Sequence, residues 1–230
     1  MDFAFVVFCF QGLLAALPIT LTIWALSVAL GALIAAGVTW MRASGIRALD
    51  LFARGYIFVF RGVPLLVQLF VIYYGLSSFP AIRHSILWPL LRDAPTCAVI
   101  SLALCTAAYQ SEIFRGALAA VPAREVEAAR ACGMSGFRLF RRIILPIALR
   151  QALPAYSTEV ISMTKATALV SLVTIWDMMS VALKIRNDTL VTYTPLLVAG
   201  VLYFVLNFVI ARVFIAVENH LTPHLRARPT

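Results

Sequence analysis

The sequence predicts an all-α integral membrane protein with five transmembrane helices. Of its 230 residues, 62% are apolar and only 13% are charged, whereas soluble domains average ~45–50% apolar and ~25% charged residues. Long stretches without a formal charge separate short arginine-rich segments. At ~20 residues per spanning helix, five spans and their loops use the whole chain, so we expect one membrane domain over residues 1–230.

The first uncharged stretch is too long for one straight span. It runs for 39 residues, from Phe3 to Met41, and Pro18 divides it. Ile19–Met41 is long enough to cross the bilayer. We expect Phe3–Leu17 either to lie at the membrane interface or to extend the same helix.

Four further apolar stretches predict the other spans. The second begins near Gly55, which places Arg61 inside it, and the fourth is interrupted by Glu159, Lys165 and Asp177. The uncharged or nearly uncharged runs are Gly62–Ile82, Ala94–Ser111 (continuing past Glu112), Ala152–Met179 and Thr189–Ala211.

The distribution of lysine and arginine predicts the orientation of the chain. Short loops rich in these residues face the cytoplasm, and arginines gather in the segments 42–54, 115–150 and 212–228. Only Arg83, Arg92, Lys184 and Arg186 lie on the other side. With five spans, the N-terminus is then outside the cell and the C-terminus is cytoplasmic.

The cytoplasmic segment 121–150 is too polar to be a span and too patterned to be a simple loop. Pro122 and the acidic residues after it favour a helix start, and Gly133 is a plausible helix end. A second helix over Ser135–Ile144 is expected, with a bend at Pro146. The segment either rests on anionic lipid as an amphipathic helix or docks a soluble partner.

The same segment resembles the EAA motif of ABC-importer permeases. Glu127, Ala128 and Ala129 are followed at the family spacing by Gly133, and then by Ile143, Leu145 and Pro146. The runs at residues 60–68, 107–116 and 159–169 resemble the polar amino-acid branch of that family. The likeness extends from Gly12 to Leu225, and the run of residues 127–136 is most similar to permeases for basic amino acids and opines.

The resemblance implies a type I ABC-importer permease fold in a bacterial cytoplasmic (inner) membrane. Expected partners are an ABC ATP-binding subunit, a second permease subunit that is identical or homologous, an extracytoplasmic solute-binding protein, and membrane lipid. Glu127, Ala128, Ala129 and Gly133 would contact the ATP-binding subunit. The chain from Ile143 through Leu145 to Pro146 would transmit its motion into the fourth span.

The chain has no phosphate-binding loop of the Gly-x-x-x-x-Gly-Lys-Ser/Thr type, so ATP and magnesium are expected on partner subunits. No cofactor and no catalytic residue are expected, and the chain is not predicted to be an enzyme. The three histidines, His84, His220 and His224, form no metal motif. We read the net charge of +9 as membrane topology rather than nucleic-acid binding.

Charged residues at membrane depth are costly and usually functional. We expect Arg61 to pair with Glu112, with Glu159, or with both, as a structural tie or a gate brace. Lys165 lies nearer the middle of the membrane. It faces either the dimer interface or the translocation path, or it pairs with a carboxylate of another span or subunit.

Four polar residues are candidates for the substrate path: Gln68, Tyr109, Ser162 and Asp177. Each has an alternative role, because the first three can equally form hydrogen bonds between helices and Asp177 can be interfacial. A self-contained channel or secondary transporter without an ATPase partner is the main alternative function. An inverted repeat would favour it, and we see none.

Overall fold

The computed structural model describes residues 3–86 and 88–221, and every regular element in this part of the chain is helical. The predictions that involved Arg226, Arg228 and His224 lie outside the described residues. In chain order the elements are α1 (Phe3–Ala43), α2 (Arg47–Gly62), α3 (Leu65–Phe70), α4 (Pro80–Arg83), α5 (Trp88–Leu91), α6 (Ala94–Ala119), α7 (Ala123–Ala131), α8 (Gly136–Leu139), α9 (Leu145–Ala166), α10 (Met178–Thr189) and α11 (Tyr193–Leu221).

Four shorter helical turns join these elements. Val71–Gly75 (η1) and Phe140–Ile144 (η3) have the wider π geometry, and Leu76–Ser78 (η2) and Thr167–Leu172 (η4) are 3-10 turns. η1 and η2 extend α3, η3 joins α8 to α9, and η4 follows α9. Short π turns inside helices are uncommon and often lie at functional sites.

Within residues 3–86 and 88–221, three helices are long and apolar enough to cross a membrane: α1, α6 and α11. A fourth span is possible if α2 and the segment Leu65–Ser78 count as one bent helix pair. α9 is 22 residues long but carries Glu159 and Lys165, two of the three charges that interrupt the predicted fourth span. By length and composition alone, the described residues thus contain three or four candidate spans, and the predicted count of five also needs α9.

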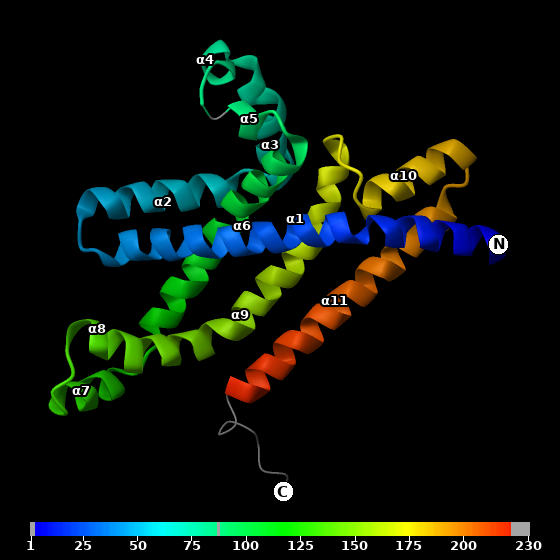
Figure 1. Cartoon of the computed structure of the whole chain (residues 1–230). Coiled ribbons are helices and arrows are strands. Elements are labelled where there is room, and N and C mark those ends of the chain that lie inside the picture. Colours follow the sequence, from blue (N-terminus) through cyan, green and yellow to red (C-terminus); the bar gives the residue numbers. More distant parts are fainter. Residues whose placement is uncertain (1–2, 87, 222–230) are drawn as a thin grey trace, which may run out of the picture.

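α1 is one continuous helix of 41 residues that passes through Pro18. Phe3–Leu17 thus extends the first span, which is one of the two predicted alternatives. At ~1.5 Å per residue the helix is about 60 Å long. Figure 1 shows it crossing beside α6, α9, α10 and α11, and it packs extensively along α6.

The α1–α6 contact depends on small residues. A Cβ atom added at Gly31 would clash with the Thr106 side chain and lie 3.2 Å from the carbonyl oxygen of Ala103. Glycine is therefore required for this close approach of two helices. The indole of Trp24 extends the contact toward α9 by donating a 3.1 Å hydrogen bond to the carbonyl of Val160.

The predicted second span is broken rather than straight, with α2 and the following segment meeting at 105°. The break lies at Val63 and Pro64, both with extended ψ angles near 133–135°. Proline disfavours helical geometry in the residue before it and has no N–H for a helical hydrogen bond. The side-chain amide of Gln68 donates to the carbonyls of Phe60 (2.9 Å) and Val63 (2.8 Å), which satisfies acceptors that the break exposes.

The other spans also differ in extent from the prediction. α9 begins at Leu145 and ends at Ala166, so the predicted fourth span, Ala152–Met179, began too late and ended too late. The rest of the predicted span is the 3-10 turn η4, the non-helical residues 173–177 and the first two residues of α10. The last span is α11, from Tyr193 to Leu221, where Thr189–Ala211 was predicted.

Candidate functional site

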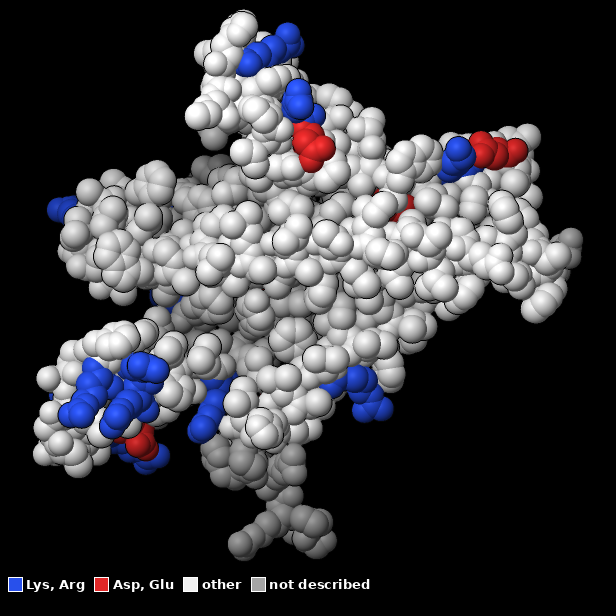
Figure 2. Space-filling model, viewed as in Figure 1, with Lys and Arg blue, Asp and Glu red and all other residues white. Residues whose placement is uncertain are grey.

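The charged side chains gather at the extremities of the molecule. In Figure 2 a broad uncharged surface covers its middle, and lysine and arginine lie over the region of α7 and α8, with further charges near α4–α5 and α10. An uncharged belt between charged ends is the pattern of a membrane-embedded protein. The α7–α8 end is the one that the sequence predicts to be cytoplasmic.

Helix α7 carries the predicted coupling motif. It begins after Pro122, which has an extended conformation, and Glu125 lies in its first turn. Glu127 and Ala128 are exposed, whereas Ala129 is buried. α7 packs against α8 and η3, so Ala129 contributes to this internal contact and the other two residues remain available to a partner.

Gly133 ends α7 in a Schellman motif. Its φ of +79° lies in the left-handed region, which glycine adopts without steric cost. Its N–H donates to the carbonyl of Arg130 (2.9 Å), and the N–H of Met134 donates to that of Ala129 (3.0 Å). These two bonds are the pair that defines the motif. The motif needs a positive φ at its end, which explains why the predicted helix end is a glycine.

The second helix that was predicted for the cytoplasmic segment continues directly into α9. Helical structure runs from Gly136 through η3 into α9, where a separate helix over Ser135–Ile144 with a bend at Pro146 was predicted. In η3 the N–H of Leu145 donates to the carbonyl of Phe140, five residues earlier. Ile143, Leu145 and Pro146 are half-buried at this junction. The chain thus passes Pro146 within continuous helical structure, with a π turn just before it.

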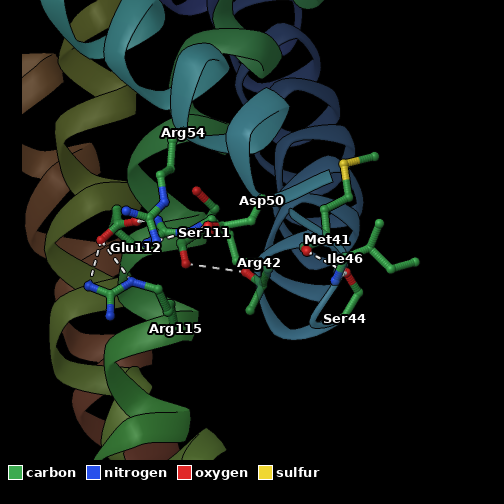
Figure 3. A network of polar contacts seen from close by, with 10 residues as sticks. Met41, Arg42, Ser44, Ile46, Asp50, Arg54, Ser111, Glu112 and Arg115 are labelled. Atoms are coloured by element: carbon green, nitrogen blue, oxygen red, sulfur yellow. Dashed lines mark hydrogen bonds and ion pairs between the residues drawn. The ribbon is translucent and has the colours of Figure 1, made fainter. Parts of the chain in front are cut away.

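An ion-pair network joins the ends of α1, α2 and α6 (Figure 3). Arg42 contacts both Asp50, at 3.0 Å, and Glu112. Asp50 also pairs with Arg54 (2.8 Å) and Glu112 with Arg115 (2.7 Å). The Arg42 side chain is only 17% exposed, so its charge is held mainly by these two carboxylates.

Arg61 is not part of this network, although its charge acts on Glu159. Within the described residues no ion pair joins Arg61 to Glu112 or to Glu159. The Arg61 guanidinium instead lies over the ring of Tyr109, 5.0 Å from its centroid. Cation–π contacts of this kind stabilise an arginine near an aromatic face.

The carboxylate of Glu159 forms a hydrogen bond with a residue of α6. Its carboxylate accepts a 2.8 Å hydrogen bond from the Thr106 hydroxyl, which links α9 to α6. Lys165 and Ser162, farther along α9, are both exposed in the single chain. They belong to a polar stripe of α9, formed by exposed residues three or four positions apart: Gln151, Ala155, Thr158, Ser162 and Lys165.

Two of the predicted path residues have structural roles. Gln68 is buried at the α2–α3 break. Asp177 is fully buried, where an interfacial residue or a path residue was predicted. It caps α10 by accepting hydrogen bonds from the N–H groups of Met179 (3.2 Å) and Ser180 (3.0 Å). Its carboxylate also accepts from the Ser180 hydroxyl at 2.7 Å.

Arg42, Asp50 and Thr106 were not predicted as site residues. The Asp50–Arg54 pair has the i,i+4 spacing of a helical ion pair, which was a usable signal. Arg42 and Glu112 are 70 residues apart, and Thr106 and Glu159 are 53 apart. No local pattern reports such contacts, because they depend on how the helices pack.

Known proteins share the helical architecture described above. Residues 27–222 match the model of the family described as binding-protein-dependent transport system inner membrane component. The chain also superposes on an amino acid ABC transporter crystallised with histidines, with a TM-score of 0.84 and 32% identity over 96% of this chain and 99% of that one. The MetNI methionine ABC transporter has the same fold, with a TM-score of 0.75 at 18% identity, over 92% and 97% of the two chains.

Relatives of known name align over nearly their whole length. The octopine transport system permease protein OccM of Rhizobium radiobacter is 51% identical over 98% of this chain and 92% of its own. The nopaline permease NocM of Agrobacterium fabrum is 43% identical over 99% and 95%. The histidine/lysine/arginine/ornithine permease HisM of Salmonella typhimurium is 38% identical over 91% of each chain. This chain therefore belongs to the family of binding-protein-dependent transport system inner membrane components, as a permease component of an ABC importer.

Proposed function

We propose that the chain is the membrane-spanning subunit of an importer for basic amino acids or opines in a bacterial cytoplasmic membrane. The relatives are named for octopine, for nopaline, and for histidine, lysine, arginine and ornithine, which supports this substrate class. The proposed domain is residues 1–230, with the coupling loop 121–150 inside it. The chain is proposed to bind no ATP, magnesium or other cofactor itself.

The observation that carries the proposal is the continuous path from α7 to the polar stripe of α9. α7 packs against η3, and η3 runs without a break into α9. Closure of an ATP-binding subunit on Glu127, Ala128 and Gly133 would push on η3. Ile143, Leu145 and Pro146 at its end would pass the motion into α9.

The polar stripe supports a second permease subunit. A polar helix face is unfavourable against lipid and is found against protein or a water-filled path. Ser162 and Lys165 are therefore proposed to face the partner permease and the translocation path, with Tyr109 and Arg61 beside it. Glu159 and Glu112 are proposed to hold the helices that line this path, rather than to bind the solute.

We propose five spans, with α2–α3 as a bent second span and α9 as the fourth. The N-terminus is then outside and the C-terminus is in the cytoplasm. A solute-binding protein would deliver the solute to the outer end, where α10 lies. Two ATP-binding subunits would dock at the α7–α8 end.

Co-purification tests the proposal. An affinity-tagged chain solubilised from its native membrane should recover an ATP-binding subunit and a permease, as identified by mass spectrometry. Liposomes containing this complex and its binding protein should then take up arginine, histidine or octopine only with internal ATP. Recovery of the chain alone, with uptake that needs no ATP, would favour a channel or secondary transporter.

A further inference from the structure

An apolar cavity of about 310 Å³ lies at the end of the bundle that carries the coupling loop. Its volume is at the lower end of the ~300–1,000 Å³ range of ligand sites. Three separate segments form its wall: the last turns of α1, the last turns of α6, and the junction of η3 with α9. The lining includes Ala36, Trp40, Phe114, Leu118, Phe140 and Ala148.

The lining has almost no polar group to offer. Apart from the indole of Trp40, its one polar side chain is Thr39. The Thr39 hydroxyl already lies 2.7 Å from the carbonyl oxygen of Ala35 and 3.2 Å from that of Ser111. Water is poorly held in an apolar cavity without hydrogen-bonding partners. The cavity is therefore suited to a hydrocarbon occupant.

The cavity is separate from the face that we assign to the partner permease. Successive residues of an α-helix are ~100° apart around its axis. On α9, Leu145, Ala148, Leu149 and Ala152 line the cavity. They lie about 110° around the helix from the centre of the polar stripe. A second permease that covers the stripe thus leaves the cavity facing the bilayer.

Two positively charged residues directly follow one of the lining residues of the cavity. Arg141 and Arg142 follow the lining residue Phe140 in η3, and both are exposed. In the described part of the chain, neither takes part in an ion pair. Trp40, whose exposed fraction is 63%, adds an aromatic residue of the type found at membrane–water interfaces.

We propose that the cavity binds one acyl chain of an anionic membrane phospholipid, whose phosphate is bound by Arg141 and Arg142. The acyl chain would fill the hydrocarbon space between α1, α6 and α9, and the arginines would supply the matching charge. Guanidinium groups bind phosphate with directed hydrogen bonds. The bound lipid would then contact η3, the turn between the coupling loop and α9.

Native mass spectrometry of the purified, delipidated complex tests the site after phosphatidylglycerol is added back. We expect one retained phosphatidylglycerol per permease chain, and much weaker retention of phosphatidylcholine. Ala36→Phe should abolish the retention, because the ring fills the cavity from an exposed position. Arg141→Gln with Arg142→Gln should lower affinity at least fivefold, since each surface arginine is worth ~1 kcal/mol toward anionic lipid.

Two matched variants control for general effects. Leu33→Phe adds a ring at another exposed position of α1, three residues from Ala36, that does not line this cavity. Arg124→Gln removes a charge from α7, where the arginine side chain is 86% exposed. Both should retain lipid as the unchanged chain does. Equal retention by Ala36→Phe, or no preference for phosphatidylglycerol over phosphatidylcholine, would overturn the proposal, whatever the complex transports.

Discussion

Arg42 ties together helix ends that are distant in the sequence. Its guanidinium meets Asp50, eight residues away, and Glu112, 70 residues away. Both side chains of the Arg42–Glu112 pair are less than a quarter exposed. Removing one partner of a poorly hydrated pair leaves the other charge without compensation, and this costs more than the pair itself contributes.

We expect Arg42→Gln to destabilise the chain by about 2–3 kcal/mol, measured as a lower thermal midpoint in detergent. Arg124→Gln on α7 should leave the midpoint unchanged, because that arginine is largely exposed. Adding Glu112→Gln to Arg42→Gln should cost less than the sum of the two single changes. Strict additivity would show that the two residues act independently.

Gly133 allows a second prediction at the scale of one residue. A Cβ at this position would meet nothing within 4 Å in the chain itself, so within this chain a substitution acts first through the backbone. Gly133→Val should weaken the Schellman motif by about 1–2 kcal/mol, because a β-branched residue resists positive φ. The measured result should be loss of the ATP-binding subunit during affinity purification.

Asparagine provides the matched control, because it tolerates the left-handed region better than other residues. Gly133→Asn should therefore keep most of the ATP-binding subunit. If the valine and asparagine variants lose it equally, the backbone explanation is wrong, and direct contact with the partner would account for the glycine.

At the scale of one element, the α2–α3 break is bridged by the side chain of Gln68. Gln68→Met keeps the length and burial of the residue but removes both hydrogen bonds to the carbonyls of Phe60 and Val63. Unsatisfied buried acceptors cost ~1–3 kcal/mol each. We expect a lower thermal midpoint, while Val67→Ala, at the exposed neighbouring position, should change it little.

The elements that the sequence predicted best are those with strong local signals. The start of α7 follows from Pro122, its end follows from Gly133, and the third span follows from its hydropathy. The break at Pro64 was missed, because an apolar run does not reveal that the chain turns inside it. The continuity of α8, η3 and α9 was missed for the opposite reason, since Pro146 reads locally as a helix break but lies within continuous helical structure.

From the sequence, we could predict only the part of the candidate site whose residues are close together in the chain. The coupling motif is contiguous in the sequence, and the structure presents Glu127, Ala128 and Gly133 at the surface of one helix and its cap. The partners of Arg61, Glu112 and Glu159 depend on the packing of α1, α2, α6 and α9. Several carboxylates and arginines were available at similar depth, so spacing alone did not select the right pairs.

For the whole molecule, the proposed topology can be tested with a native side chain. Cys132 is exposed at the end of α7, whereas Cys9, Cys97 and Cys105 are buried. A membrane-impermeant maleimide should therefore label Cys132 in inside-out vesicles and not in intact cells. Excess ATP-binding subunit should protect it, because the thiol lies beside the proposed contact.

Asn187, exposed on α10, gives the complementary probe. In a Cys132→Ala background, the Asn187→Cys variant should be labelled in spheroplasts, which give access to the outer face, and not in sealed inside-out vesicles. If the native Cys132 thiol and the thiol introduced by Asn187→Cys were labelled from the same side, the proposed five-span orientation would be contradicted.

The length of α1 has a mechanical consequence. The helix is about 60 Å long, twice the ~30 Å thickness of the hydrocarbon layer. Arg42 fixes one end of it, and the other end packs against α10 and α11. A tilt of about 5° around the fixed end would move the far end by about 5 Å, from the same length estimate. Such a tilt would convert a small rearrangement near Arg42 into a larger displacement at the Phe3 end of α1.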